Sequence, residues 1–197
     1  MLGTTDFVIN CRSQRDVLMP DQLTQPFDAH AWARSSLHDA PKLHSDTLLT
    51  VAGFTFVWNL FEGIACNSHV TVPELDRVAT RLTHLLKITD IKQSLSFYRF
   101  RYVKDGELQD LFYGLNFRQP DKQELVASVL KDKGTSHHEN IMALLIIAYR
   151  IRNNIFHGLK SVHIWDDQAQ NISEASRILS IAFEALCPHI AKRACVT

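Results

Sequence analysis

The sequence lacks most of the patterns by which metal sites, phosphate loops and secretion signals are recognised. Its four cysteines, at positions 11, 66, 187 and 195, form no Cys-x-x-Cys pair and are too sparse for a disulfide framework. No glycine-rich phosphate loop, zinc-ligand set, Ser-His-Asp context or carboxylate cluster for a divalent metal is visible. We therefore expect no metal and no cofactor, and any catalysis must use the protein's own side chains.

Net charge is also missing, because 21 basic and 21 acidic side chains cancel to a formal charge of +0. Contact with nucleic acid would then need a local basic patch. The first twenty residues carry four charged side chains and no apolar core segment, so we expect no secretory signal and, with this cysteine usage, a cytoplasmic protein. The apolar stretch 47–66 is interrupted by Asn59 and Glu62, which favours a buried helix over a membrane span.

The chain divides into an irregular N-terminal stretch and a longer part with regular helical patterns. Residues 1–45 are broken by three prolines, and we interpret them as an extension docked on the core, with a short helix over 28–37 capped by Asp28. The alternative is that this extension reaches a partner subunit. Residues 46–197 read as one helical domain. Apolar periodicity and capping pairs predict its helices over 47–66, 72–88, 90–100, 121–132, 136–157 and 172–192, with caps at Thr71, Asp90, Ser136 and Asn171.

Between these helices the sequence predicts loops. The stretch from Lys104 to Pro120 reads as a loop or a short hairpin, Trp165-Asp-Asp reads as a turn, and Pro188 should kink or shorten the last helix. The fold class is all-α, a bundle of about four main antiparallel helices with short accessory helices and the N-terminal extension.

One stretch stands out, Arg150-Ile-Arg-Asn-Asn-Ile-Phe-His-Gly158, which ends the apolar run that begins at Ile141. Arg152 and His157 are five residues apart, about 140° around an ideal helix and about 7.5 Å along it, so they do not share a stripe. Asn153 and His157, four apart, do. Two copies of the helix could pool these residues across a two-fold axis. Alternatively, the cations simply complement the helix dipole and Gly158 ends the helix.

The string Arg152-Asn-Asn-Ile-Phe-His157, preceded by Tyr149-Arg-Ile and followed by glycine, resembles the Arg-x4-His signature of the HEPN superfamily, in particular its prokaryotic members. The segment Trp58-Asn-Leu-Phe-Glu62 is similar to the polar-bearing early helix that faces the motif helix in that family. Both segments together cover a small part of the chain. The resemblance implies a HEPN-like helical bundle, which agrees with the fold expected from periodicity.

The resemblance further implies a metal-independent endoribonuclease that leaves 2′,3′-cyclic phosphate ends. His157 would move protons, Arg152 would hold the phosphate, and Asn153 would hold the imidazole or a phosphate oxygen. The supporting residues would be Glu62, Asn59, Asn154 and Arg150. We expect Glu62 to pair with Arg152 first and Arg150 second, since an acid in an apolar helix needs a cation.

Candidate RNA contacts are Arg99, Arg101, Lys104 and Lys160. The interleaving of basic and aromatic residues over 99–104 suits base stacking, but it suits the edge of a packed element better.

The resemblance also implies a homodimer with the motif helix at the interface, an RNA substrate, and a toxin or phage-defence context with a possible antitoxin. Two alternatives stay open: a non-catalytic HEPN module that binds nucleotide, RNA or protein, and a structural dimer whose arginines only make ion pairs.

Overall fold

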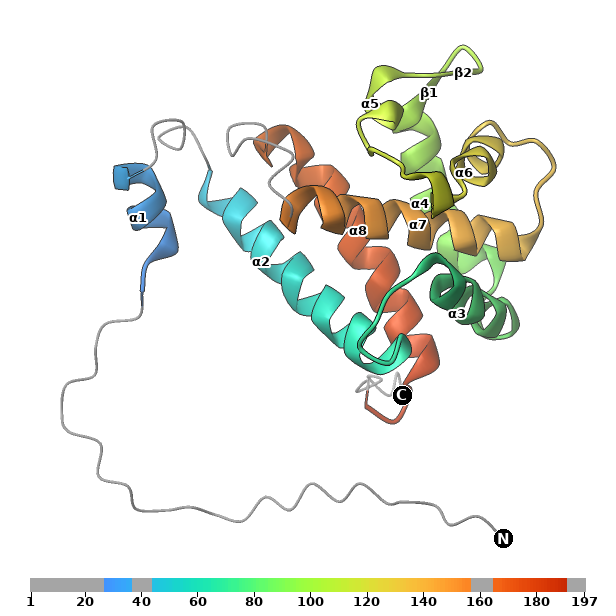
Figure 1. The fold of residues 1–197 in the computed structure, drawn as a ribbon, viewed down its shortest axis with the longest axis horizontal. Coiled ribbons are helices and arrows are strands. Elements are labelled where there is room, and N and C mark those ends of the chain that lie inside the picture. The colour runs from blue at the N-terminus through green and yellow to red at the C-terminus, as the bar shows by residue number, and fades with distance from the viewer. Residues whose placement is uncertain (1–26, 37–43, 157–164, 191–197) are drawn as a thin grey trace, which may run out of the picture.

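A computed structural model describes residues 27–36, 44–156 and 165–190 of the 197-residue chain. Over these ranges the protein is all-α apart from one two-stranded hairpin (Figure 1). In chain order the elements are α1 (Ala29–Ser36), α2 (Ser45–Leu60), the π-helical turn η1 (Phe61–Ala65), α3 (Val72–Leu85), α4 (Ile88–Tyr102), β1 (Val103–Lys104), β2 (Glu107–Leu108), α5 (Asp110–Tyr113), the 3₁₀ turn η2 (Gln119–Asp121), α6 (Gln123–Leu130), α7 (His137–Phe156) and α8 (Trp165–Leu186).

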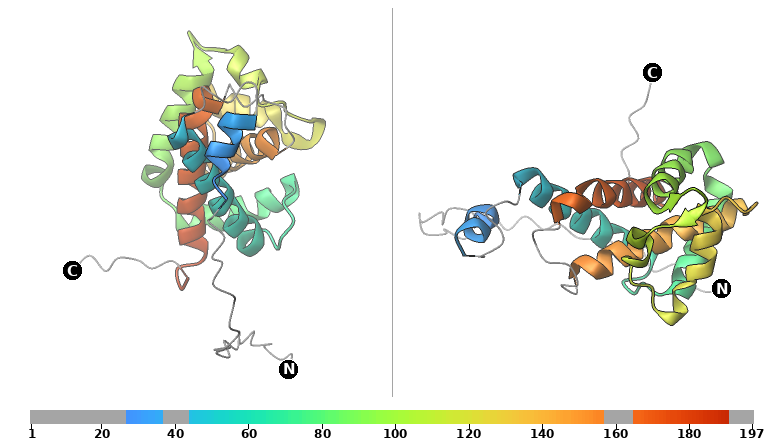
Figure 2. Two further views of the ribbon diagram at one scale, coloured as in Figure 1. Left: turned by 90° about the vertical axis from the view of Figure 1, so that its left-hand side faces the viewer. Right: turned by 90° about the horizontal axis from the view of Figure 1, so that it is seen from above.

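The core is organised around α7, whose residues are buried almost without interruption from Asn140 to Ile151. Helices α3, α4, α6 and α8 all pack against it, while α2 lies along α8. The hairpin and α5 lie at one end of this bundle and α3 at the other (Figure 2). Because helices α3, α4, α6 and α8 pack around α7, the middle of the helix is buried and its two ends reach the surface.

Several local signals in the sequence are confirmed. The Ser136 hydroxyl accepts from the amide of Glu139 at 3.2 Å, while the Glu139 carboxylate accepts from the Ser136 amide at 2.7 Å, a reciprocal cap that starts α7. Thr71 caps α3, accepting from the Glu74 amide at 3.3 Å, but the Glu74 carboxylate accepts from Arg77 and does not complete the expected reciprocal cap. The expected hairpin turns at Asp105 and Gly106, both with the positive φ that a tight two-residue turn requires.

Helix boundaries were less predictable. Helix α4 begins at Ile88, and Asp90 stands in its third position, where its carboxylate accepts from the Lys87 amide at 2.7 Å. Helix α6 begins at Gln123, after a left-handed residue at Lys122.

The prediction for the last helix was wrong at its start. Helix α8 begins at Trp165, so Trp165-Asp-Asp is its first turn and Asn171 lies inside it, buried, accepting from the Tyr102 hydroxyl at 3.1 Å. Asn171 resembled a helix cap in the sequence, but it is there because the buried Tyr102 hydroxyl needs a hydrogen-bond acceptor. The helix ends at Leu186, two residues before Pro188, as expected from the ring of that residue.

The interpretation of 47–66 as a buried helix is correct for one face only. Only Thr47, Phe54 and Trp58 are buried within α2, and Leu49 and Phe56 keep 70% and 66% of their surface exposed. By length and composition alone, 45–65 is the one helical segment among the described residues that could cross a membrane. Composition showed an apolar helix but could not show how many of its faces the rest of the chain covers.

Within the N-terminal extension the structure describes α1, which begins as predicted, with the Asp28 carboxylate accepting from the Ala31 amide at 2.9 Å. Helix α1 lies beside the N-terminal half of α2, with an apolar hollow between them. Phe27 and Trp32 stack loosely on one another and remain largely exposed. The other residues of the extension, 1–26 and 37–43, lie outside the described ranges.

Candidate functional site

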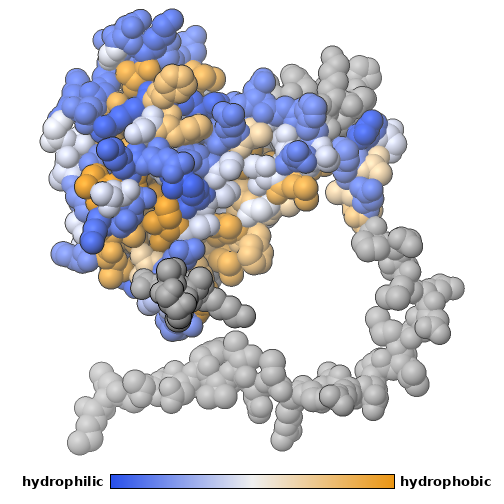
Figure 3. All heavy atoms as spheres, turned by 180° about the vertical axis from the view of Figure 1, so that it is seen from behind, coloured by the Kyte–Doolittle hydropathy of each residue, from blue (hydrophilic) through white to orange (hydrophobic). Residues whose placement is uncertain are grey.

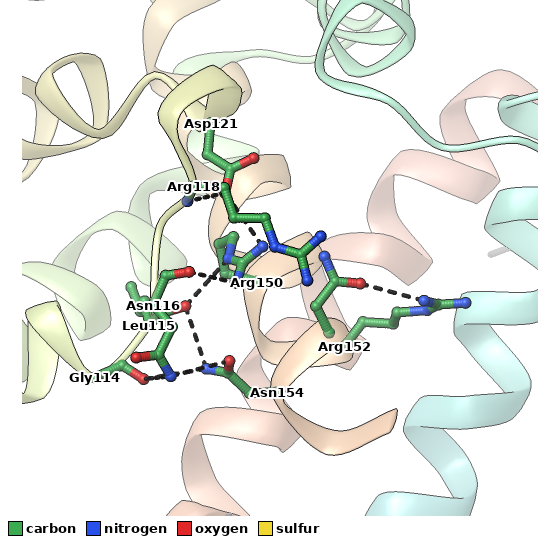
Figure 4. A network of polar contacts seen from close by, with 9 residues as sticks. Gly114, Leu115, Asn116, Arg118, Asp121, Arg150, Arg152 and Asn154 are labelled. Atoms are coloured by element: carbon green, nitrogen blue, oxygen red, sulfur yellow. Dashed lines mark hydrogen bonds and ion pairs between the residues drawn. The ribbon is translucent and has the colours of Figure 1, made fainter. Parts of the chain in front are cut away.

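The polar cluster at the end of α7 separates into an inward-facing and an outward-facing group (Figure 4). Arg150 and Asn154, four residues apart, point toward the loop between α5 and α6. Arg152 points the other way, toward α2 and η1. Helical spacing explains the division, because residues four apart share a face and residues two apart do not.

Arg150 is a structural residue. Its side chain is 1% exposed and lies 3.2 Å from a carboxylate oxygen of Asp121, which is equally buried. Its guanidinium also donates to the carbonyls of Leu115, at 3.1 Å, and Asn116. Burial lowers the pKa of Arg150 below its usual range, while the neighbouring Asp121 carboxylate opposes that shift. A cation so enclosed is not accessible to a substrate.

Asn154 completes this inward group. Its side-chain amide donates to the carbonyls of Gly114, at 3.1 Å, and Leu115, at 3.3 Å, and its oxygen accepts from the side chain of Asn116. Together with Arg150 it satisfies backbone acceptors of the segment between α5 and η2. Both residues, expected to support chemistry, therefore hold the loop against α7.

Arg152 lies at the surface end of the site. Its guanidinium carbon sits 5.6 Å from the ring centre of Trp58 and 5.0 Å from that of Phe156, and one nitrogen lies 3.8 Å from a Glu62 carboxylate oxygen. The expected pairing of Glu62 with Arg152 is confirmed. Its alternative partner, Arg150, is bound to Asp121 instead.

The hydrogen-bonding capacity of Arg152 is largely unused. Within the described residues its only hydrogen bond goes to the side-chain oxygen of Asn153, at 3.2 Å, and its Nε is buried with no acceptor. A guanidinium carries five N–H donors in a planar fork that matches a phosphate or carboxylate. Aromatic faces and one distant carboxylate hold this fork in place while leaving donors for an anionic ligand.

Glu62 lies where the winding of the helix changes. The α-helix of α2 passes into the wider turn η1 at Phe61, and such turns recur at functional sites. The Trp58 indole donates to the Glu62 carboxylate at 2.6 Å and stacks against Tyr149 of α7 with ring centres 6.3 Å apart. Asn59, expected on the same face as Glu62, is exposed beside it.

His157, Gly158 and Lys160 lie outside the described residues, which stop on this side of the gap at Phe156. Phe156 is 48% exposed, so the helix reaches the surface at the residue before His157.

Of the other candidate RNA contacts, Arg99 and Arg101 bind groups of the protein itself, whereas Lys104 is exposed. Arg99 donates to the carbonyl of Val129 and pairs with Asp132 at 2.7 Å. Arg101 donates to the side chain of Gln168 at 3.3 Å, and Lys104 is exposed on the hairpin. The two arginines join α4 to α6 and α8, which favours the packed-edge interpretation of this stretch.

The structure adds a cation that the sequence did not single out, Arg118. Its amide donates to Asp121 at 2.6 Å, which fixes the backbone, while its exposed side chain extends past Arg150 along α7 (Figure 4). The two guanidinium groups are close enough that Arg118 helps to lower the pKa of Arg150. A lone arginine in a loop carries no sequence pattern, so only the tertiary arrangement reveals it.

On the expectation that the protein binds RNA, Arg118→Ala should weaken binding of single-stranded RNA about tenfold and reduce the dependence of log Kd on log salt by about one, because one phosphate contact would be lost. Fluorescence anisotropy over a range of salt concentrations measures both quantities. Lys92→Ala, which removes an exposed cation from α4, is the matched control and should change neither.

In the part of the chain that the structure describes, neither a metal centre nor a reactive Cys66 thiol competes with this arrangement. No three His, Cys, Asp or Glu side chains gather at metal-binding distance among the described residues. Burial raises the pKa of Cys66, at the end of η1, to about 12, and the nearby Glu62 and Glu74 carboxylates add to that shift. The thiol therefore stays protonated and unreactive at neutral pH.

Comparisons with protein-family models, with curated proteins and with solved structures gave no match to this chain.

Proposed function

We propose that the protein is an endoribonuclease of the HEPN type that cleaves RNA without a metal ion. The observation that carries the proposal is the state of Arg152: a cation positioned by Glu62, Trp58 and Phe156, with one hydrogen bond among the described residues, five residues before His157 in the sequence. Arg150, which serves packing, instead donates to two backbone carbonyls and pairs with the buried Asp121 carboxylate.

The chemistry follows from the residue types. The ribose 2′-oxygen attacks the adjacent phosphorus as it loses its proton, and the bond to the 5′-oxygen breaks as that oxygen gains one. The products are a 2′,3′-cyclic phosphate and a 5′-hydroxyl end. An imidazole, with a reference pKa near 6.5, suits this proton transfer at neutral pH. Arg152 stabilises the charge on the non-bridging oxygens, and Asn153 orients the Arg152 fork.

The assembly we propose is a homodimer in which two copies bring their motifs to one cleft. The spacing of Arg152 and His157 in the sequence supports this, because an ideal helix would present residues five apart on different sides. The proposed setting is cytoplasmic, with the activity restrained by an antitoxin or another regulatory protein. The alternative proposal is a non-catalytic module that uses Arg152 to bind nucleotide, RNA or a protein partner.

The deciding experiment is cleavage of total RNA, tRNA and a single-stranded pool in the presence of EDTA. We expect the wild-type protein to produce cyclic phosphate ends and His157→Ala to produce none. His138→Ala, at the other end of α7, removes a half-buried surface histidine and should cleave normally. RNA binding without cleavage by any variant would favour the non-catalytic module.

A further inference from the structure

Helix α2 carries an apolar seam on the face that the rest of the described chain leaves open. The seam consists of Leu49, Gly53, Phe56 and Leu60 of α2, at steps of four, three and four residues, and it continues three residues later at Gly63 in the wider turn η1. This is the heptad spacing by which one helix packs along another. Its members face away from Phe54 and Trp58, through which α2 is buried in its own bundle.

The seam is open to contact. Leu49 is 70% and Phe56 66% exposed, and a side chain built on Gly53 or Gly63 would meet nothing within 4 Å. Helix α1 borders the seam near Leu49 without covering it. Seen from behind, the molecule exposes apolar side chains on the helical bundle and along the N-terminal part of α2, next to α1 (Figure 3). Contiguous exposed apolar surface on a folded protein marks an interaction site.

We infer that the seam binds the same seam of a second copy, with the two α2 helices antiparallel about a two-fold axis near Phe56. The sizes along the seam are complementary in that arrangement. Leu60 of one copy falls on Gly53 of the other, the two Phe56 rings meet at the axis, and Leu49 lies opposite the turn η1 that holds Gly63. In a parallel pair glycine would face glycine at two levels, which leaves voids.

The antiparallel pair also places the candidate site. A two-fold axis perpendicular to both helices keeps a flanking residue of each copy on the same side of the pair. Glu62 flanks the seam and lies six residues from Phe56, so the two copies hold their Glu62–Arg152 pairs on one surface, about 20 Å apart. The inference gives the proposed shared cleft its interface, yet it depends on shape alone and is tested without measuring cleavage.

The first test is the mass of the full chain in solution, by light scattering and sedimentation. We expect twice the 22.5 kDa of one chain, and we expect Phe56→Asp to raise the dimer dissociation constant about 30-fold or more while the far-ultraviolet circular dichroism stays unchanged. Phe100→Asp is the matched control, since Phe100 is 90% exposed on α4, and should remain dimeric.

The second test is orientation, by oxidative cross-linking relative to the wild-type chain. Phe56→Cys should cross-link to itself and Gly53→Cys should not. A mixture of Gly53→Cys and Leu60→Cys chains should form mixed dimers, which Gly53→Cys with Phe100→Cys should not.

The possible results separate cleanly. A monomeric wild-type chain, a dimer unaffected by Phe56→Asp, efficient self-cross-linking of Gly53→Cys, or a monomer that floats with phosphatidylcholine–phosphatidylglycerol vesicles would each overturn the inference. A dimer with the expected cross-links that cleaves no RNA supports it and counts against the ribonuclease alone.

Discussion

Arg152→Ala should lower the rate of RNA cleavage by about 100- to 1,000-fold, the effect of removing one donor group that stabilises transition-state charge. Its folding should hardly change, with a loss of less than about 1 kcal/mol, because the pair with Glu62 is partly exposed and 3.8 Å long. Single-turnover cleavage of a labelled oligonucleotide and urea denaturation measure the two effects separately.

Arg152→Lys is the informative companion variant. It keeps the positive charge but loses the planar fork, so cleavage should recover only in part. The result that contradicts a catalytic role is an Arg152→Ala protein that cleaves normally. A variant that loses several kcal/mol of stability would instead indicate that Arg152 serves only to tie α7 to η1.

Arg150→Ala, two residues away, should have the opposite phenotype. Removing this side chain leaves the Asp121 carboxylate charged and buried without a partner, and frees the carbonyls of Leu115 and Asn116. The expected loss is about 3–5 kcal/mol in the free energy of unfolding, a large part of the stability of a domain of this size. Urea or thermal denaturation followed by circular dichroism measures it.

Arg99→Ala is the control for Arg150→Ala, because it removes an arginine of the same size that pairs with an exposed carboxylate, Asp132. Its cost should be about 1 kcal/mol or less. If the two variants lost the same free energy of unfolding, the burial of Arg150 would not increase its contribution to stability. Substrate affinity, measured on whatever fraction of Arg150→Ala folds, should be close to wild type, since Arg150 cannot reach a ligand.

The two arginines show how far the sequence could be interpreted. The helical periodicity of 141–155 and the Ser136–Glu139 cap predicted α7 within one residue of its start, because both signals are local. The presence of an acidic residue in an apolar helix correctly predicted that Glu62 pairs with Arg152. The same reasoning could not assign Arg150, since its partner Asp121 is reached only through the fold of the loop before α6.

The sequence by itself determined the all-α class, most of the helices, and the motif at the end of α7, since hydrophobic period, capping and glycine stops act over a few residues. Tertiary structure alone decided which arginine is buried, that Arg118 lies beside the motif, and that Asn171 serves Tyr102 inside α8. It also decided that α2 leaves one apolar face uncovered. These features depend on contacts between segments far apart in the chain, and local patterns carry no information about which segments will meet.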